Sequence, residues 1–125
     1  MIETSPGIVW EAQSPLGQAV TLKQHTLYTH IIQDRKRTEF IGEENTLKDV
    51  VEHPRYVIPD KDYKDTRHVY CDLRYISALD SIYWVQVVVD HSIQPNDVAT
   101  AIACRTIPRL ETENIYYDSQ TKTDL

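Results

Sequence analysis

The sequence has few of the residues that mark secreted, membrane or metal-binding proteins. It contains only 2 cysteines, and no apolar run approaches the length of about 20 residues that crosses a bilayer. Cys71 and Cys104 stand in apolar segments without the Cys-x-x-Cys spacing of zinc or redox sites, so we expect free thiols, no metal and no cofactor. The N-terminus lacks a basic segment leading into an apolar one, which predicts a cytoplasmic protein with no membrane contact.

Positive charge is also scarce. The chain has 13 Lys and Arg against 19 Asp and Glu, a formal net charge of -6. This balance argues against a nonspecific nucleic-acid binder, whose affinity comes from many contacts between basic side chains and phosphates. A weakly acidic protein can still carry a small basic site, and the one basic cluster in this sequence is Arg35-Lys36-Arg37.

The length and apolar content fit one domain. With 125 residues and 41% hydrophobic residues, the chain is large enough for a single core, which we place in residues 1–110. Residues 111–125 lack apolar periodicity and are rich in acidic side chains. We predict that they form an acidic tail that is mobile or loosely docked. The sequence does not indicate an oligomeric state.

The first part of the chain predicts a hairpin and a helix. Two short extended segments, Ile8 to Trp10 and Gln18 to Val20, are separated by turn-forming residues. The next residues, Thr21 to Gln24, have the form of a helix-capping box and precede apolar residues at helical spacing. This pattern predicts a helix from about Leu22 to Arg35.

A second helix and four strands are predicted in the rest of the domain. The helix begins with acidic and capping residues at Glu43 to Thr46, carries an apolar stripe, and ends at Pro54. The pattern then changes to alternating or continuous apolar runs, which are typical of strands. The predicted strands are Arg55–Pro59, Arg67–Ile76, Ile82–Val89 and Val98–Thr106. Short connections favour a meander, so the predicted fold is α+β, with N-terminal helices packed on one face of a four-stranded antiparallel sheet.

The strand that begins at Arg67 alternates strictly between polar and apolar residues. The polar row is His68, Tyr70, Asp72 and Arg74, and the apolar row, which we expect to face the core, is Val69, Cys71 and Leu73. The polar row combines the groups of acid–base and phosphate chemistry on one face. The same alternation is typical of the solvated face of a half-buried strand, so the row alone favours that simpler interpretation.

Three segments together carry a resemblance to a known family. They are Thr21 to His25 continuing through His30-Ile31, then Thr46 to Pro54 leading into Tyr56 to Ile58, and finally Val98 to Ala101. Over about residues 18 to 106 the chain resembles a phage-associated family of nucleases in the barnase, EndoU, colicin and RelE fold group. The resemblance implies a metal-independent ribonuclease, phage-encoded or toxin-like, which drives the ribose 2′-hydroxyl against the adjacent phosphate. RNA is then the substrate, and an inhibitor or immunity protein is a further expected partner.

Such a reaction needs a general base, a general acid and groups that stabilise charge on the phosphate. His30 matches the helix histidine of the family, and Thr100 matches the hydroxyl residue of its last strand. The remaining candidates are His68 as a second proton-transfer group, Arg74 and Tyr70 on the scissile phosphate, Arg35, Lys36 and Arg37 on substrate phosphates, and Asp72 to orient a histidine or hold Arg74. Each has a structural alternative: an exposed helix histidine, basic side chains at a helix C-terminus, or a common strand residue.

The chain departs from the family pattern in one place. Ile31 to Arg37 offers arginines where related chains have a second histidine. His25 lies five residues before His30, and five steps on an ideal α-helix rotate by roughly 140 degrees, so His25 is expected to point elsewhere. The ribonuclease hypothesis therefore requires His30 and Arg74 to meet at one cleft.

Two alternatives remain open. One is a noncatalytic binding protein of the same fold, either a degenerate relative or an immunity-type partner, for which an acidic body is natural. The other, ranked last, is a small-molecule or peptide-binding domain that uses Trp84 and the tyrosines, because aromatic residues on strands are more often packing residues.

Overall fold

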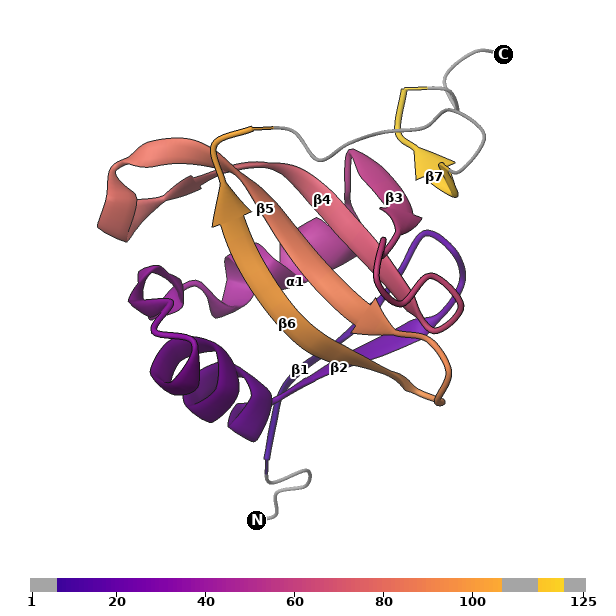
Figure 1. Ribbon diagram of the computed structural model, residues 1–125, viewed down its shortest axis with the longest axis horizontal. Helices are drawn as coiled ribbons and strands as arrows, with labels where there is room; N and C mark the ends of the chain where they lie inside the picture. Colours follow the sequence, from indigo (N-terminus) through magenta and orange to yellow (C-terminus); the bar gives the residue numbers. More distant parts are fainter. Residues whose placement is uncertain (1–6, 107–114, 121–125) are drawn as a thin grey trace.

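The computed structural model describes residues 7–106 and 115–120. Within these residues, seven strands form one mixed sheet in the order β1-β2-β6-β5-β4-β3-β7 (Figure 1). The strands are β1 (Ile8–Gln13), β2 (Ala19–Lys23), β3 (Tyr56–Pro59), β4 (Arg67–Ile76), β5 (Ser81–Asp90), β6 (Asn96–Cys104) and β7 (Tyr117–Asp118). The helical segments are η1 (His25–Asp34), η2 (Thr38–Phe40), α1 (Glu44–Glu52) and η3 (Ser77–Leu79).

The predicted α+β class and the meander are confirmed. The four strands expected from Arg55 onward are β3 to β6, which pair in sequence as antiparallel neighbours. The predicted hairpin is also present as β1 and β2. The prediction for residues 111–125 stays a prediction; within this range, Tyr117 and Asp118 pair with β3, while 111–114 and 121–125 lie outside the described residues.

The prediction of a four-stranded antiparallel sheet preceded by helices is wrong. The N-terminal hairpin joins the sheet through a parallel pairing of Val20 and Thr21 with Asn96 and Asp97. At the opposite edge, β7 adds a strand beside β3. The sheet therefore gains strands on both sides of the meander, and two of them come before the first helix.

The predicted start of the first helix is also wrong. Thr21 and Leu22 belong to β2, and the helix begins at His25. Val20, Thr21 and Leu22 are all buried, because β2 lies between β1 and β6. Pairing and burial on both sides outweigh a local capping pattern, which contributes only about 1 kcal/mol.

The second helix follows its prediction closely. α1 buries its apolar stripe of Leu47, Val50 and Val51 completely. The buried Glu43 holds the start of α1, since its carboxylate accepts hydrogen bonds from the Thr46 hydroxyl (2.6 Å) and from the backbone N–H of Ser77 (3.1 Å).

The core lies mainly between α1, η1 and one face of the sheet. Its buried members include Leu27 and Ile31 from η1 and Tyr70 from β4. A smaller cluster of Ile58, Val69 and Val88 lies on the opposite face. In Figure 1, α1 lies behind the sheet and η1 lies beside β6, so the viewer faces the side of the sheet opposite α1.

The alternation of β4 is correct, and its predicted orientation holds only in part. Val69 and Cys71 are buried, Val69 in the smaller cluster, but Leu73 is largely exposed, and Tyr70, from the polar row, is completely buried in the main core. The polar row faces α1 because α1 supplies a carboxylate, Asp49, that pairs with Arg74 at this face.

In the described part of the chain, no helix has the length and apolar character needed to span a lipid bilayer.

Candidate functional site

Residues from the end of η1 meet the open edge of β6. Strand β2 pairs with β6 only at Asn96 and Asp97, so the rest of this edge has no neighbouring strand among the described residues. Arg37 fills part of the edge: its Nη1 donates hydrogen bonds to the Thr100 hydroxyl oxygen at 3.0 Å and to the Ala101 carbonyl oxygen at 2.7 Å. The structure thus brings together two of the predicted site residues, Arg37 and Thr100.

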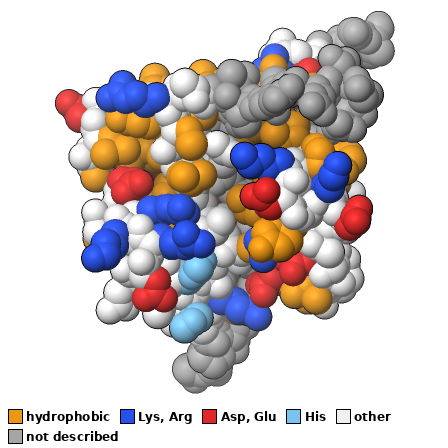
Figure 2. All heavy atoms as spheres, viewed as in Figure 1, with side chains coloured by type: hydrophobic (Ala, Val, Ile, Leu, Met, Phe, Trp, Pro, Cys, Tyr) orange, Lys and Arg blue, Asp and Glu red, His pale blue; other side chains and the backbone are white. Residues whose placement is uncertain are grey.

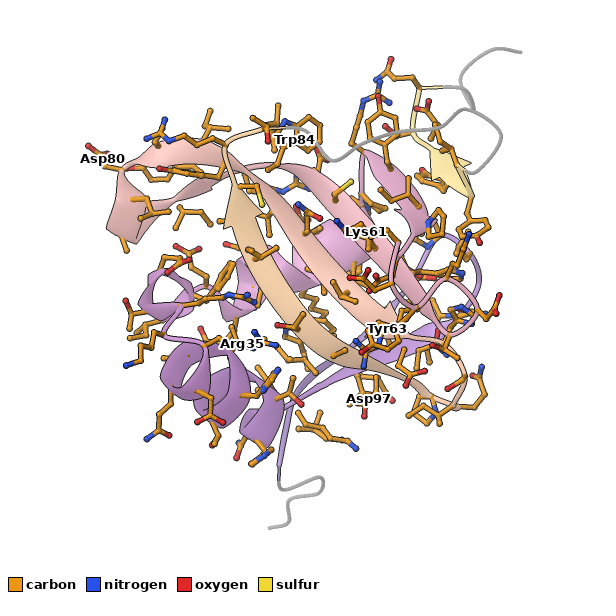
Figure 3. The ribbon with its side chains drawn as sticks, in the orientation of Figure 1. Arg35, Lys61, Tyr63, Asp80, Trp84 and Asp97 are labelled. Atoms are coloured by element: carbon orange, nitrogen blue, oxygen red, sulfur yellow. The ribbon has the colours of Figure 1, made fainter. Side chains whose placement is uncertain are left out.

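Arg35 and Lys36 accompany this contact. In Figure 3, Arg35 points into the space between η1 and β6. Desolvation lowers the pKa of Arg37, and the charge of Arg35 acts in the same direction, which places the two guanidinium groups close together. Lys36 takes a left-handed backbone conformation (φ 58°) where the chain turns after η1, and its side chain is exposed.

Helix η1 is a π-helix, and this changes the expected position of His25. A π-helix closes each turn on the residue five positions along, as the hydrogen bond from the Arg35 N–H to the His30 carbonyl oxygen (3.0 Å) shows. His25, His30 and Arg35 are spaced by five residues, so successive members lie about one turn apart. The expectation that His25 points elsewhere was made for an ideal α-helix, and the five-residue closure of η1 brings the directions of His25 and His30 closer together.

These side chains form a polar group beside β6, on the face seen in Figure 2. The figure shows two histidines together with several Lys and Arg side chains over η1 and its border with β6. We call His25, His30, Arg35, Arg37 and Thr100 the η1–β6 cluster. His25 and Arg35 are exposed, whereas His30, Arg37 and Thr100 are half-buried, so the cluster is open to a ligand from solvent.

Arg74 lies elsewhere and has other partners. Its guanidinium forms ion pairs with Asp49 (2.8 Å) and Asp72 (2.9 Å) and donates to the His53 carbonyl oxygen (3.2 Å). The pKa of Arg74 is raised because these carboxylate contacts outweigh desolvation. Asp72 holds Arg74, which is one of the two roles that the sequence predicted for Asp72. The second ion pair of Arg74, with Asp49, joins β4 to α1. The requirement that Arg74 meet His30 is not supported by any of these contacts.

His68 and Tyr70 also lie outside the η1–β6 cluster. The ring of His68 stacks on that of His91, with centroids 3.9 Å apart, and tilts against Tyr116 at 4.7 Å. Desolvation, together with the neighbouring His91, lowers the pKa of His68 to about 4. Tyr70 is buried in the main core, and burial raises its pKa. Neither side chain is placed for proton transfer at the cluster.

Sequence reasoning missed His25 because it assumed an α-helix. The signal was present in the spacing, since basic side chains recur at intervals of five residues in His25, His30 and Arg35. Both cysteines are free thiols, as predicted. Across residues 7–106 and 115–120, no group of three or more His, Cys, Asp or Glu side chains is arranged to hold a metal ion.

Comparison with known proteins finds no match. No protein-family model matches the chain, and neither do any curated proteins or solved structures. A function for this chain is therefore inferred from the η1–β6 cluster and from the resemblance of short sequence segments to the nuclease family.

Proposed function

We propose that this chain is a metal-independent endoribonuclease whose active site is the η1–β6 cluster, with Arg35 and Arg37 in the role that the sequence interpretation gave to Arg74. The observation that carries the proposal is the hydrogen bond from Arg37 to Thr100. It joins the basic segment after the first helix to the hydroxyl residue of the last meander strand. Thr100 lies in Val98 to Ala101, one of the segments on which the resemblance to the nuclease family rests, and Arg37 follows the helix that carries His30; the two residues are 63 apart in sequence.

The five side chains supply the groups that the reaction needs. Imidazoles titrate near neutral pH and suit both proton transfers, so one of His25 and His30 takes the proton of the 2′-hydroxyl. The 2′-oxygen then bonds to phosphorus, and the 5′-oxygen leaves and takes a proton from the other imidazole. The products are a 2′,3′-cyclic phosphate and a free 5′-hydroxyl.

Arg35, Arg37 and Thr100 stabilise the charge that develops on the phosphate. Guanidinium groups donate paired, charge-assisted hydrogen bonds to phosphate oxygens. The Thr100 hydroxyl accepts its hydrogen bond from Arg37, which leaves its own hydrogen free to donate to the substrate. The cluster thus combines proton transfer and charge stabilisation on one side of the sheet.

The direct test is incubation of the purified protein with RNA in the presence of EDTA. We expect products with cyclic-phosphate ends, and a loss of about 10²-fold or more in rate for His30→Ala and for His25→Ala. Thr100→Val, which keeps the shape of the side chain and removes the hydroxyl, is expected to slow cleavage without unfolding the protein.

His53→Ala and Arg74→Ala serve as controls, because neither side chain belongs to the cluster. Cleavage that stays unchanged in the cluster variants would point to a contaminating nuclease, and equal loss in the control and cluster variants would point to a general loss of folding. No cleavage by a folded wild-type protein, across single-stranded and structured RNAs, would refute the proposed activity.

A noncatalytic binding protein of the same fold is the second candidate. One observation favours it: the contacts of Arg37 with Thr100 and the Ala101 carbonyl cover an open strand edge, which is a structural role that needs no substrate. This candidate predicts RNA or protein binding by the intact cluster with no cyclic-phosphate product, so the same cleavage assay separates the two.

A further inference from the structure

The β4–β5 hairpin extends past both of its neighbours in the sheet. The pairing of β3 with β4 stops at Cys71, and β6 ends at Cys104, opposite Trp84. We call the ribbon from Leu73 to Trp84 the arm; among the described residues, Leu73 to Tyr83 pair only within the hairpin, and Trp84 also pairs with Cys104. It projects from the sheet in Figure 1, and in Figure 3 Asp80 marks its tip and Trp84 its root.

The two faces of the arm differ sharply. On the face toward α1, Ile76 is completely buried, Tyr83 packs against the main core, and Ser77 donates its N–H to Glu43. The opposite face carries four large apolar side chains, which are Leu73, Tyr75, Ile82 and Trp84. Leu73, Tyr75 and Ile82 are 46%, 53% and 61% exposed, respectively. A lone two-stranded ribbon is only marginally stable, so the anchored face holds the arm in place, while on the other face, which we call uncovered with reference to the described residues alone, Leu73, Tyr75 and Ile82 stay exposed.

Trp84 connects the uncovered face to the η1–β6 cluster. Its cross-strand partner, Cys104, is four residues along β6 from Thr100, which is about 13 Å at the rise of a strand. Because the interval is even, both side chains project from the same face of the sheet. Arg37 lies at this edge of β6, where it contacts the Thr100 hydroxyl and the Ala101 carbonyl oxygen.

We propose that the uncovered face of the arm is a stacking platform for the bases of single-stranded RNA whose phosphates lie at the η1–β6 cluster. This inference rests on the proposed function and names its substrate class. The exposed ring of Tyr75 and the half-buried ring of Trp84, which stacks on Tyr56 with centroids 6.4 Å apart, offer surfaces to bases of any sequence, because every base has a π-face. Bases in a duplex stack on one another and are not available to a flat protein surface, which selects single strands.

The charges around the arm favour RNA over a purely apolar partner. Near its root, Arg37 lies beside Thr100 on β6, and Arg105 covers the Tyr83 ring at 5.1 Å on the face toward α1. At the tip, the Tyr75 hydroxyl donates to the carboxylate of Asp80 at 2.6 Å. A phosphate backbone is therefore attracted to the root and repelled from the tip, which turns the bases toward the apolar face. A partner that bound through apolar contacts alone would need none of these cations.

Intrinsic fluorescence gives a direct test, because the chain has only 2 tryptophans. Trp10 is 7% exposed and donates its indole N–H to the Glu44 carbonyl oxygen, whereas Trp84 is on the uncovered face. The probe is a 2′-O-methyl oligonucleotide, which lacks the attacking hydroxyl and is not cleaved. We expect it to quench the fluorescence of the wild type and to leave Trp84→Phe, in which only Trp10 reports, unchanged. Binding detected by anisotropy with no quenching in the wild type would overturn the platform.

Substitutions on the arm provide the second test. Tyr75→Ala and Ile82→Ala alter exposed side chains and leave the anchored face intact, so both variants are expected to fold. Tyr75→Ala is expected to weaken binding of the oligonucleotide by about 5- to 100-fold. Tyr75→Phe, which keeps the ring, is expected to bind normally. Tyr63→Ala is the matched control, because Tyr63 is equally exposed, at 53%, but lies at the other end of the sheet from Trp84 (Figure 3).

The outcomes separate this inference from the proposed function. Quenching and Tyr75-dependent binding without any RNA cleavage would keep the platform and reject the nuclease. Cleavage of single-stranded RNA that is unaffected by Tyr75→Ala and Ile82→Ala would keep the nuclease and reject the platform. A wild-type dimer that these substitutions dissociate, with no effect on oligonucleotide binding, would show that a second copy covers the arm and would also reject the platform.

Discussion

The stacked histidine pair predicts that the protein loses stability in mild acid. His68 packs between His91 and Tyr116, and its Nδ1 is buried with no hydrogen-bond partner. Protonation places a positive charge at this poorly solvated ring and next to a second imidazole. The fold therefore favours the neutral form of His68, which is why its pKa is lowered to about 4.

The sign and size of the effect follow from this pKa. Between the usual value of 6.5 and the folded-state value of about 4, the unfolded chain binds more protons than the folded chain, so stability falls as the pH falls. One pKa unit is about 1.36 kcal/mol, which corresponds to about 3.4 kcal/mol for the whole interval in a fully buried ring. His68 is only half-buried, and we expect solvent screening to reduce the loss to about 1–2 kcal/mol.

The charged neighbours of His68 do not reverse this sign. Hydrogen bonds from Ser92, followed by the charges of Arg67 and His91, keep the pKa of Asp90 below its usual value. The stabilising contribution of Asp90 is therefore lost only at lower pH than the interval in which His68 acts.

Urea unfolding of the wild type and of His68→Phe, from neutral pH down to about 4, measures the effect. The phenylalanine ring can keep the contacts with His91 and Tyr116 and does not titrate. We expect the wild type to lose about 1–2 kcal/mol more than the variant across this interval. Parallel pH profiles for the two proteins would refute the reasoning.

Three further predictions concern the packing of α1. Leu47→Ala removes a completely buried side chain and is expected to cost about 2–5 kcal/mol in urea unfolding, whereas Leu73→Ala, at a largely exposed position, should cost less than about 1 kcal/mol. Arg74→Met breaks the ion pair with Asp49, which joins β4 to α1, and the ion pair with Asp72 on β4 itself; we expect a loss of about 1–3 kcal/mol in the same assay and unchanged RNA cleavage, and a loss of cleavage with intact stability would contradict this assignment. Glu43→Ala leaves the Thr46 hydroxyl and the Ser77 N–H without their acceptor and is expected to lower the thermal midpoint by several degrees, an effect that a midpoint equal to the wild type would rule out.

The parts of the fold with strong periodicity could be predicted from the sequence. The strand from Arg67 to Ile76 alternates its residues between the two faces of the sheet, and α1 buries side chains at intervals of three to four residues, so each pattern can be recognised within its own segment. The role of Thr21 could not be found in this way. Its burial depends on β1 and β6, and the partner residue Asp97 is far along the chain.

The candidate site was predictable in its residue types and not in its grouping. His30, Arg35, Arg37 and Thr100 stand out by sequence, but only the fold shows that η1 ends at the open edge of β6. On β4 the grouping failed in another way. The even spacing correctly placed His68 and Arg74 on one face of the strand, but neither residue belongs to the η1–β6 cluster. Spacing along one strand cannot reveal which other elements cover that face, and here α1 takes Arg74.

The unpaired edge of β6 makes Arg37 a poor choice for an inactivating mutation. A row of free backbone N–H and C=O groups is a template for a strand from another molecule, and the guanidinium of Arg37 blocks one such carbonyl. Removing this side chain would expose the template and invite self-association, so lost activity could reflect aggregation. Arg35, which forms no hydrogen bond to β6 through its side chain, is the safer position at which to abolish phosphate binding while keeping the protein monodisperse.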